Sequence, residues 1–211
     1  MLNINEYLIN KKTKEKKIEY KYFPNTKDEL RDLIHHRIDT EGPTCDLNDI
    51  DISKISKMRW LFSESEFNGD ISQWDVSHIT DMRGMFADCK FNGDISKWNV
   101  GQVTDMKYMF VDSEFNGDIS DWNVSSVKTM VDMFSEDTTK FNGDISKWNV
   151  SNVEHFAQMF KNNKHFTGDI SKWNVQHAID FALANGDIPF LNMFENSKLE
   201  EIGKVPKWYN I

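Results

Sequence analysis

A block of about 25 residues is repeated five times in succession, and this repetition constrains the fold more than any other feature of the chain. The copy that begins at Phe91 reads Phe-Asn-Gly-Asp-Ile-Ser-Lys-Trp-Asn-Val. Successive copies place their tryptophans 24, 24, 26 and 25 residues apart. A fixed period of this length is typical of a solenoid, in which each repeat packs only against its neighbours. The tryptophans are Trp74, Trp98, Trp122, Trp148 and Trp173.

The second copy shows the structure that we expect of one repeat. Trp98 and Val100 are two residues apart, which is the spacing of a short strand with one buried face. Apolar residues recur three, six and seven positions after Val103, which predicts a short helix, and Asp105 lies where that helix needs an N-cap. We therefore predict an α/β solenoid with parallel strands on one face, helices on the other, and tryptophan and methionine in the core.

The ends of the chain depart from the repeat, and we divide it into three regions. Residues 1–43 are expected to form an N-terminal cap of a hairpin and a helix. Residues 44–194 are expected to form the solenoid, with one half repeat and five copies. Residues 195–211 are expected to form a C-terminal cap. Because both ends of the core would then be covered, we expect a monomer.

Two patterns support the N-terminal cap. Apolar and charged residues alternate in segment 18–22, which predicts a strand that pairs with residues 2–9 across a lysine-rich turn. Thr26 and Glu29 have the spacing of a capping box, which predicts a helix that ends at Gly42.

The fifth copy breaks the pattern after its tryptophan. Ala178 and Phe181 stand where the other copies have apolar residues of the core, and the Met-Phe pair returns only at Met193 and Phe194, about nine residues late. We expect an insertion there, and we expect the tail 205–209 to cover the last exposed face of the core.

Charge and cysteine content exclude several classes of function. The net charge of −9 argues against direct binding to nucleic acid or to an anionic membrane. We expect Cys45 and Cys89 to be free thiols, with a bridge between them as the alternative. The sequence as given has no signal-peptide or membrane-spanning run, so we expect a cytoplasmic protein, with a surface or secreted location only if a leader has been removed. Scattered histidines and the lack of a phosphate loop or nucleophile elbow predict no enzyme, cofactor or metal.

The copies resemble the BspA-like leucine-rich-repeat proteins of bacteria. The resemblance rests on the phrase quoted above, followed by Val-Thr-Asp-Met and a Met-Phe pair, and covers about residues 46–194. It implies an irregular leucine-rich-repeat solenoid that attaches to surfaces or binds proteins and has no catalytic centre. The lipid-attachment cysteine and the wall-anchoring tail of that family are not found in this sequence, so binding is expected without surface display.

An aspartate follows the glycine in every copy, and stacking would bring these carboxylates together. Their repulsion would cost up to about 1 kcal/mol per pair in water. We expect each aspartate to accept backbone N–H groups in its own turn. Calcium between repeats is the alternative, although the motif lacks the ligand pattern of known calcium loops. The column consists of Asp70, Asp94, Asp118, Asp144 and Asp169.

Two further columns flank the buried tryptophan and should point outward. The first could be a structural asparagine ladder or part of a recognition surface, and it consists of Asp75, Asn99, Asn123, Asn149 and Asn174. The second varies between copies, as a recognition surface or a drifting solvated face would, and it consists of Gln73, Lys97, Asp121, Lys147 and Lys172.

These patterns favour a non-enzymatic protein–protein interaction module that binds a protein partner through these two columns and the adjacent loops. The alternative is an acidic inhibitor that imitates nucleic acid and blocks a nucleic-acid enzyme, because a row of carboxylates on a rod can resemble a phosphate backbone. Strong salt dependence of partner binding would favour the second function.

Overall fold

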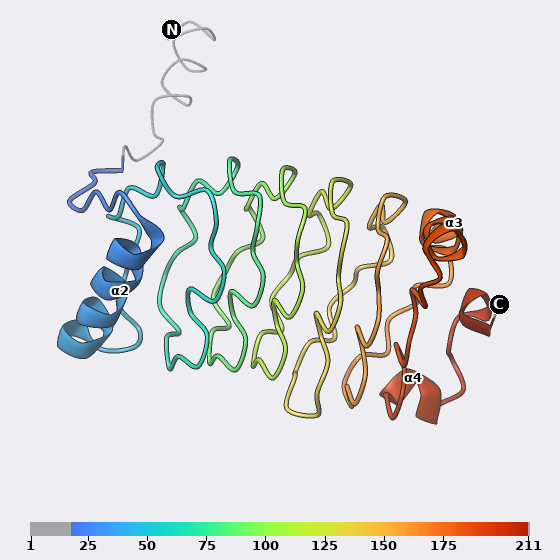
Figure 1. Cartoon of the computed structure of the whole chain (residues 1–211). Helices are drawn as coiled ribbons and strands as arrows, with labels where there is room; N and C mark the ends of the chain where they lie inside the picture. The colour runs from blue at the N-terminus through green and yellow to red at the C-terminus, as the bar shows by residue number, and fades with distance from the viewer. Residues whose placement is uncertain (1–17, 211) are drawn as a thin grey trace, which may run out of the picture.

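The computed structural model describes residues 18–210, which form an elongated stack of similar rungs (Figure 1). The regular elements lie at its ends: α2 (Lys27–Glu41) at one, and α3 (Gln176–Asn185), α4 (Lys198–Glu201) and the 3-10 helix η1 (Lys207–Asn210) at the other. The predicted solenoid is therefore observed. Its predicted α/β character is not, because the copies between these ends contain neither a regular strand nor a helix within the described residues.

The strand predicted around each tryptophan is replaced by turns. In the second copy, the side chains of Asp94, Asn99 and Asp105 each accept the backbone N–H two residues further on, at 2.9, 3.1 and 3.0 Å. A turn every five or six residues leaves extended stretches too short for a ladder. Strand pairing between the described rungs is limited to isolated parallel bridges, such as those that link Asp81 to Asp105 and Asp105 to Thr129.

The helix predicted after Val103 is replaced by bonds between rungs. Amide groups of residues 106–112 donate across to the carbonyl groups of the next copy at 2.9–3.4 Å, and Tyr108 and Asp112 have φ of +59° and +54°. The apolar residues still point inward, so the spacing resembles that of a helix, while alternate amides donate to the next rung and not to the helical acceptor four residues back. Asp105 consequently caps a turn instead of a helix. The four pairs are Met106 with Thr129, Tyr108 with Val131, Phe110 with Met133, and Asp112 with Ser135.

The core consists of aromatic columns that run along the stack. Each repeat tryptophan is buried, and its indole N–H donates to a carbonyl group of the preceding rung, as Trp98 does to Ile71 at 3.2 Å. Two phenylalanine columns stack beside the tryptophans, and Phe86 and Phe91 lie 4.5 Å apart between their ring centroids. The predicted tryptophan core is thus confirmed, as is the burial of the methionines Met82, Met85, Met106, Met109, Met130, Met133 and Met159.

The N-terminal helix α2 begins and ends where the sequence predicts. The Thr26 hydroxyl accepts the Glu29 N–H at 3.1 Å, and Gly42 ends the helix with φ of +93°. Upstream, Tyr22 forms a parallel bridge with Ile50. The hairpin partner predicted at residues 2–9 lies outside the described residues.

Candidate interaction site

The aspartate column closes turns within its own rungs. All five side chains are exposed, and each accepts the N–H of the serine two residues on, at 2.8–2.9 Å. Hydrogen bonds from Ser96 hold the pKa of Asp94 below its ordinary value, and those from Ser120 lower the pKa of Asp118 in the same way. No cluster of His, Cys, Asp or Glu within residues 18–210 is arranged to hold a metal ion.

The asparagine column beside the tryptophans also closes turns, and it does not form a ladder. Asn99 and Asn123 accept the N–H of Gly101 and Ser125 at 3.1 and 3.2 Å within their own rungs. The ladder predicted there lies instead at the asparagine of the Phe-Asn-Gly phrase, where each side chain accepts the backbone N–H of the next rung at 2.8–2.9 Å. Its members are Asn68, Asn92, Asn116 and Asn142.

The variable column is exposed along its whole length. Gln73, Lys97, Asp121, Lys147 and Lys172 are all exposed, as are the five residues of the asparagine column. Lys97 also lies near enough to Asp94 and Asp118 to help lower the pKa of both carboxyl groups. The structure thus brings the ten predicted residues onto one surface, and the partner-binding role of that surface remains a prediction.

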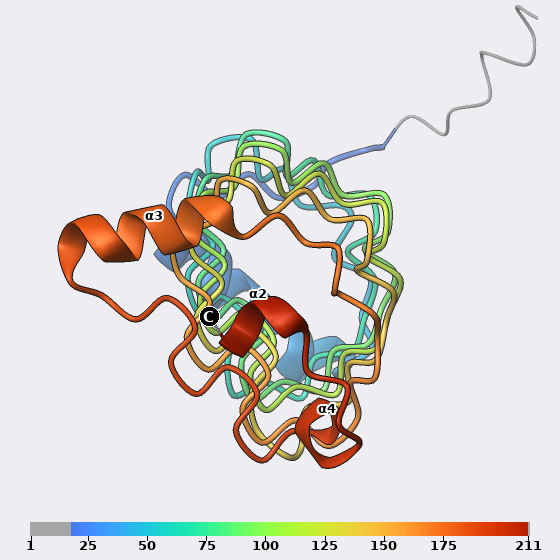
Figure 2. The same cartoon turned by 90° about the vertical axis from the view of Figure 1, so that its right-hand side faces the viewer.

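A groove that the sequence analysis did not predict lies where the fifth copy breaks. Helix α3 projects sideways from the outline of the rungs, and the segment after it returns to the stack (Figure 2). Leu183, Ile188 and Leu191 are 81%, 61% and 47% exposed. The groove has a volume of about 570 Å³, and its apolar lining also includes Ile179, Ala182, Pro189, Phe190 and Tyr209.

Specific contacts hold this groove open against the body of the molecule. Gly186 ends α3 in the left-handed conformation, with φ of +69°. Asp187 then pairs with the Nδ1 of His155 at 3.0 Å, and Phe181 meets the His155 ring edge-on at 5.2 Å. On the inner side, Phe190 packs between Phe156 and Trp208. The groove is therefore a built feature with anchored walls.

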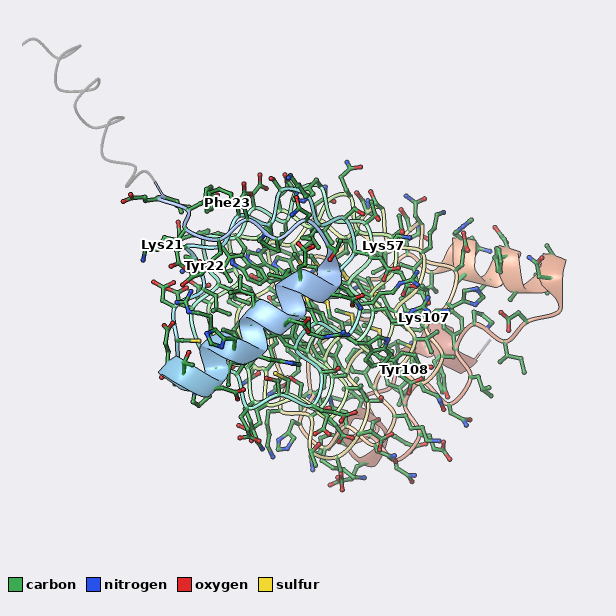
Figure 3. The ribbon with its side chains drawn as sticks, turned by 60° about the vertical axis from the view of Figure 1, so that its left-hand side comes forward. Lys21, Tyr22, Phe23, Lys57, Lys107 and Tyr108 are labelled. Carbon is green, nitrogen blue, oxygen red and sulfur yellow. The ribbon has the colours of Figure 1, made fainter. Side chains whose placement is uncertain are left out.

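A smaller aromatic surface lies nearer the N-terminal end. The Trp60 ring covers Gly84, where a Cβ would come within 2.1 Å of it, and stacks on Tyr108 at 5.9 Å. Figure 3 shows Tyr108 beside Lys107, with Lys57 on the same side of α2. A flat ring next to lysines can stack on a planar or apolar group. The sequence analysis missed this pair, although Trp60, Gly84 and Tyr108 occupy a column in which the copies differ.

The repeats also identify the chain's relatives. A family model described as "Mycoplasma protein of unknown function, DUF285" matches residues 35–114 and 111–197, which together cover most of the chain. The chain belongs to this family. The two DUF285 matches span the stacked rungs, α3 and the segment that returns after it. No curated protein and no solved structure matches the chain.

Neither the cysteines nor the helices of the described residues indicate a further functional site. Cys45 and Cys89 are free and buried, and burial raises the pKa of the Cys89 thiol to about 11, so this thiol is a weak nucleophile. Within residues 18–210, no helix has the length and apolar character that a membrane span requires.

Proposed function

We propose that this chain is a non-enzymatic protein-interaction module whose main contact is the groove between α3 and residues 186–192. One observation carries the proposal: three of the four leucine and isoleucine side chains that are exposed among the described residues, Leu183, Ile188 and Leu191, lie together at this groove. Contiguous exposed apolar surface with anchored walls is typical of a site that another molecule covers. A protein partner would remove these side chains from water, at about 25 cal/mol for each Å² of apolar area buried.

The kinship to BspA-like leucine-rich-repeat proteins is part of this proposal. It is supported by the repeated phrase around the tryptophan and by the solenoid that this phrase builds. The exposed variable column, with Lys97 and Lys147, would be a second contact for the same partner.

The acidic mimic of nucleic acid stays as the second candidate because of one observation. The five aspartates of the turn column are exposed in a regular row, and hydrogen bonds lower the pKa of each. Each of these carboxyl groups therefore stays charged to a lower pH than an ordinary aspartate does. The neighbouring lysines reduce the net negative charge of the row, which favours the protein-binding function over this one.

The test is capture of partners on the immobilised full chain from bacterial and host-cell lysates, read by mass spectrometry. The wild type is compared with Leu183→Asp/Ile188→Asp in the groove and with Lys97→Glu/Lys147→Glu in the variable column. Asp39→Lys, an exposed change on α2, is the matched control. We expect a protein that the wild type and the control retain at moderate salt and that the groove variant loses.

Other outcomes of this capture are equally informative. Loss only in the lysine variant would move the main contact to the variable column. Recovery of nucleic-acid enzymes that dissociate as salt rises would establish the acidic mimic. Equal recovery on all four proteins would refute both surfaces.

A further inference from the structure

On the face formed by segment 106–112 and its equivalents, the backbone hydrogen bonds between rungs run in one direction. In every described rung, alternate amide groups of the 106–112 segment or its equivalents donate toward the C-terminal end, and the next rung supplies the carbonyl groups. The last such rung is 189–195, whose carbonyl groups receive the amides of Phe156, Gln158, Phe160 and Asn162 at 2.8–2.9 Å. Its own alternate amides, at positions 190–196, therefore face the C-terminal end, where residues 18–210 supply no further rung.

The chain covers only part of this terminal edge. Asn196, the outermost donor position, gives its N–H to the Glu200 carboxylate at 2.7 Å. Phe194 lies under the Tyr209 ring at 5.0 Å; burial raises the pKa of the Tyr209 hydroxyl, and a hydrogen bond with the Phe194 backbone opposes that rise. The amides of Phe190 and Asn192 have no acceptor among residues 18–210.

The two open amides border the apolar groove. Phe190 and Asn192 both line it, together with Leu191. Asn192 keeps the left-handed backbone conformation of its column, with φ of +52°, so the edge retains the geometry of the inner rungs. The indole N–H of Trp208 is also buried there without a partner in the described part of the chain. Hydrogen-bond donors and an apolar pocket thus occur side by side.

We infer that the groove binds an extended polypeptide segment of a protein partner, which adds to the stack as one more rung. Its backbone carbonyl groups accept the amides of Phe190 and Asn192, and one of its aliphatic or aromatic side chains enters the groove. The mode is the addition of a chain to an open hydrogen-bonding edge, with affinity from the backbone and specificity from the pocket. This inference rests on the proposed function and names the kind of segment that is recognised.

A second copy of this chain does not fit the same edge. The carbonyl groups that it would have to offer belong to its first rung, and α2 lies across that end (Figure 1). Leu30 and Ile34 of α2 are buried in the core, and Lys27 donates to the Arg59 carbonyl at 3.2 Å. Head-to-tail stacking would require α2 to leave, so a segment from another protein is favoured.

The test uses a peptide that already has the sequence of a rung. Residues 129–136 of this chain, acetylated and amidated, are titrated into the ¹⁵N-labelled full chain, with a scrambled peptide as control. We expect saturable shifts of the Phe190 and Asn192 amide signals and slower hydrogen exchange of both when the peptide is bound. Leu183→Asp should weaken binding by roughly tenfold or more, which corresponds to about 1.4 kcal/mol or more, whereas the distant change Asp39→Lys on α2 should leave it unchanged.

Three results would overturn the inference. The first is equal binding of the scrambled peptide, and the second is exchange of the Phe190 and Asn192 amides in the free chain as slow as that of the inner Tyr108 amide. The third is a concentration-dependent dimer in sedimentation that Leu183→Asp abolishes and the peptide does not displace, which would assign the groove to a second copy. If the groove variant no longer captures partners from lysate but the peptide does not bind the wild type, the proposed protein-binding function is supported and the addition of a rung is wrong. If the groove variant changes neither partner capture nor peptide binding, both the proposed function of the groove and the addition of a rung are wrong.

Discussion

At the N-terminal end α2 lies across the first rung, whereas at the C-terminal end α3 leaves the stack (Figures 1 and 2). Apolar side chains of α3 and of the segment after it, such as Leu183 and Ile188, are exposed. Arg37 of α2 is buried, donates to Asp49 and to the Asp46 carbonyl at 3.0 and 2.9 Å, and pairs with Glu41. At the other end, η1 places Trp208 and Tyr209 over part of the last rung and leaves its neighbouring groove open.

The difference shows that a solenoid can seal its core and present a binding surface at separate ends. A terminal repeat must cover apolar surface that the inner repeats cover for each other. Here α2 does so with a polar outer face, and η1 does so only in part. The remaining apolar surface lies beside the backbone N–H groups of Phe190 and Asn192, which have no acceptor among residues 18–210, and this is why we assign recognition to this end.

The largest loss of stability should follow a change at the N-terminal end, which α2 covers. Arg37→Ala removes the buried partner of Asp49 and Glu41, although Lys21 still pairs with Asp49 and Glu41 is partly exposed. The free energy of unfolding should therefore fall by about 3 kcal/mol, the lower end of the range for breaking a buried ion pair. Arg31→Ala is the matched control, because Arg31 pairs with Asp28 in an exposed position, and it should cost less than about 1 kcal/mol. Equal losses in urea unfolding of the two variants would show that the buried pair does not hold α2.

A smaller loss should follow at the open end. Trp208→Ala removes a half-buried ring that packs on Phe190 and Phe194, and it should lower the free energy of unfolding by about 2 kcal/mol. Thermal melting followed by circular dichroism measures this change, with the exposed Lys207→Ala as control. A melting temperature unaltered by Trp208→Ala would mean that η1 does not cover the core.

Between the ends, the turns should respond to acid. Asp94→Ala removes the acceptor for the Ser96 N–H and should cost about 1 kcal/mol, whereas Asp94→Asn should cost less because Asn99 makes the same turn with an amide oxygen. The folded-state pKa of Asp94 is lowered, so its contribution is complete above the ordinary value of about 3.8 and is lost as pH falls through the folded-state value. Unfolding measured from pH 6 to pH 2 should therefore show a smaller acid-induced loss for Asp94→Asn than for wild type, and an identical loss would contradict the assignment.

The smallest effect on stability should come from the groove. Leu183 is 81% exposed, so Leu183→Asp should change the free energy of unfolding by less than about 0.5 kcal/mol while it weakens binding. A large loss of stability in the same urea experiment would mean that Leu183 supports the fold, and its effect on binding would then say nothing about recognition.

The sequence was sufficient to predict the solenoid, the tryptophan and methionine core and α2. It could not separate a helix from a rung in segment 103–110, because both place apolar residues at the same spacing and differ only in where the amides donate. Left-handed backbone at Tyr108 and Asp112 is also unreadable from residue type, since most side chains disfavour it.

The predicted columns show the same limit of sequence-based prediction at the level of single side chains. Asn92 and Asn99 are both exposed asparagines of one copy, yet only Asn92 bridges rungs, because the direction of each side chain depends on the turn around it. The groove had a readable signal. Leu183 and Ile188 fall in the insertion, where apolar residues have no core column to join, and Leu191 follows them at an exposed position of the last rung.

Each rung of the stack is bonded to the rungs before and after it, as Asn92 is to Asn68 and Asn116. The length of the stack is consequently set by the number of copies. Loss or gain of one whole copy, such as residues 91–114, would change the separation of the two ends by about 4.8 Å and leave the chemistry of each end as it was. Duplication of one copy in the gene is therefore enough to change the distance between the two ends of the stack.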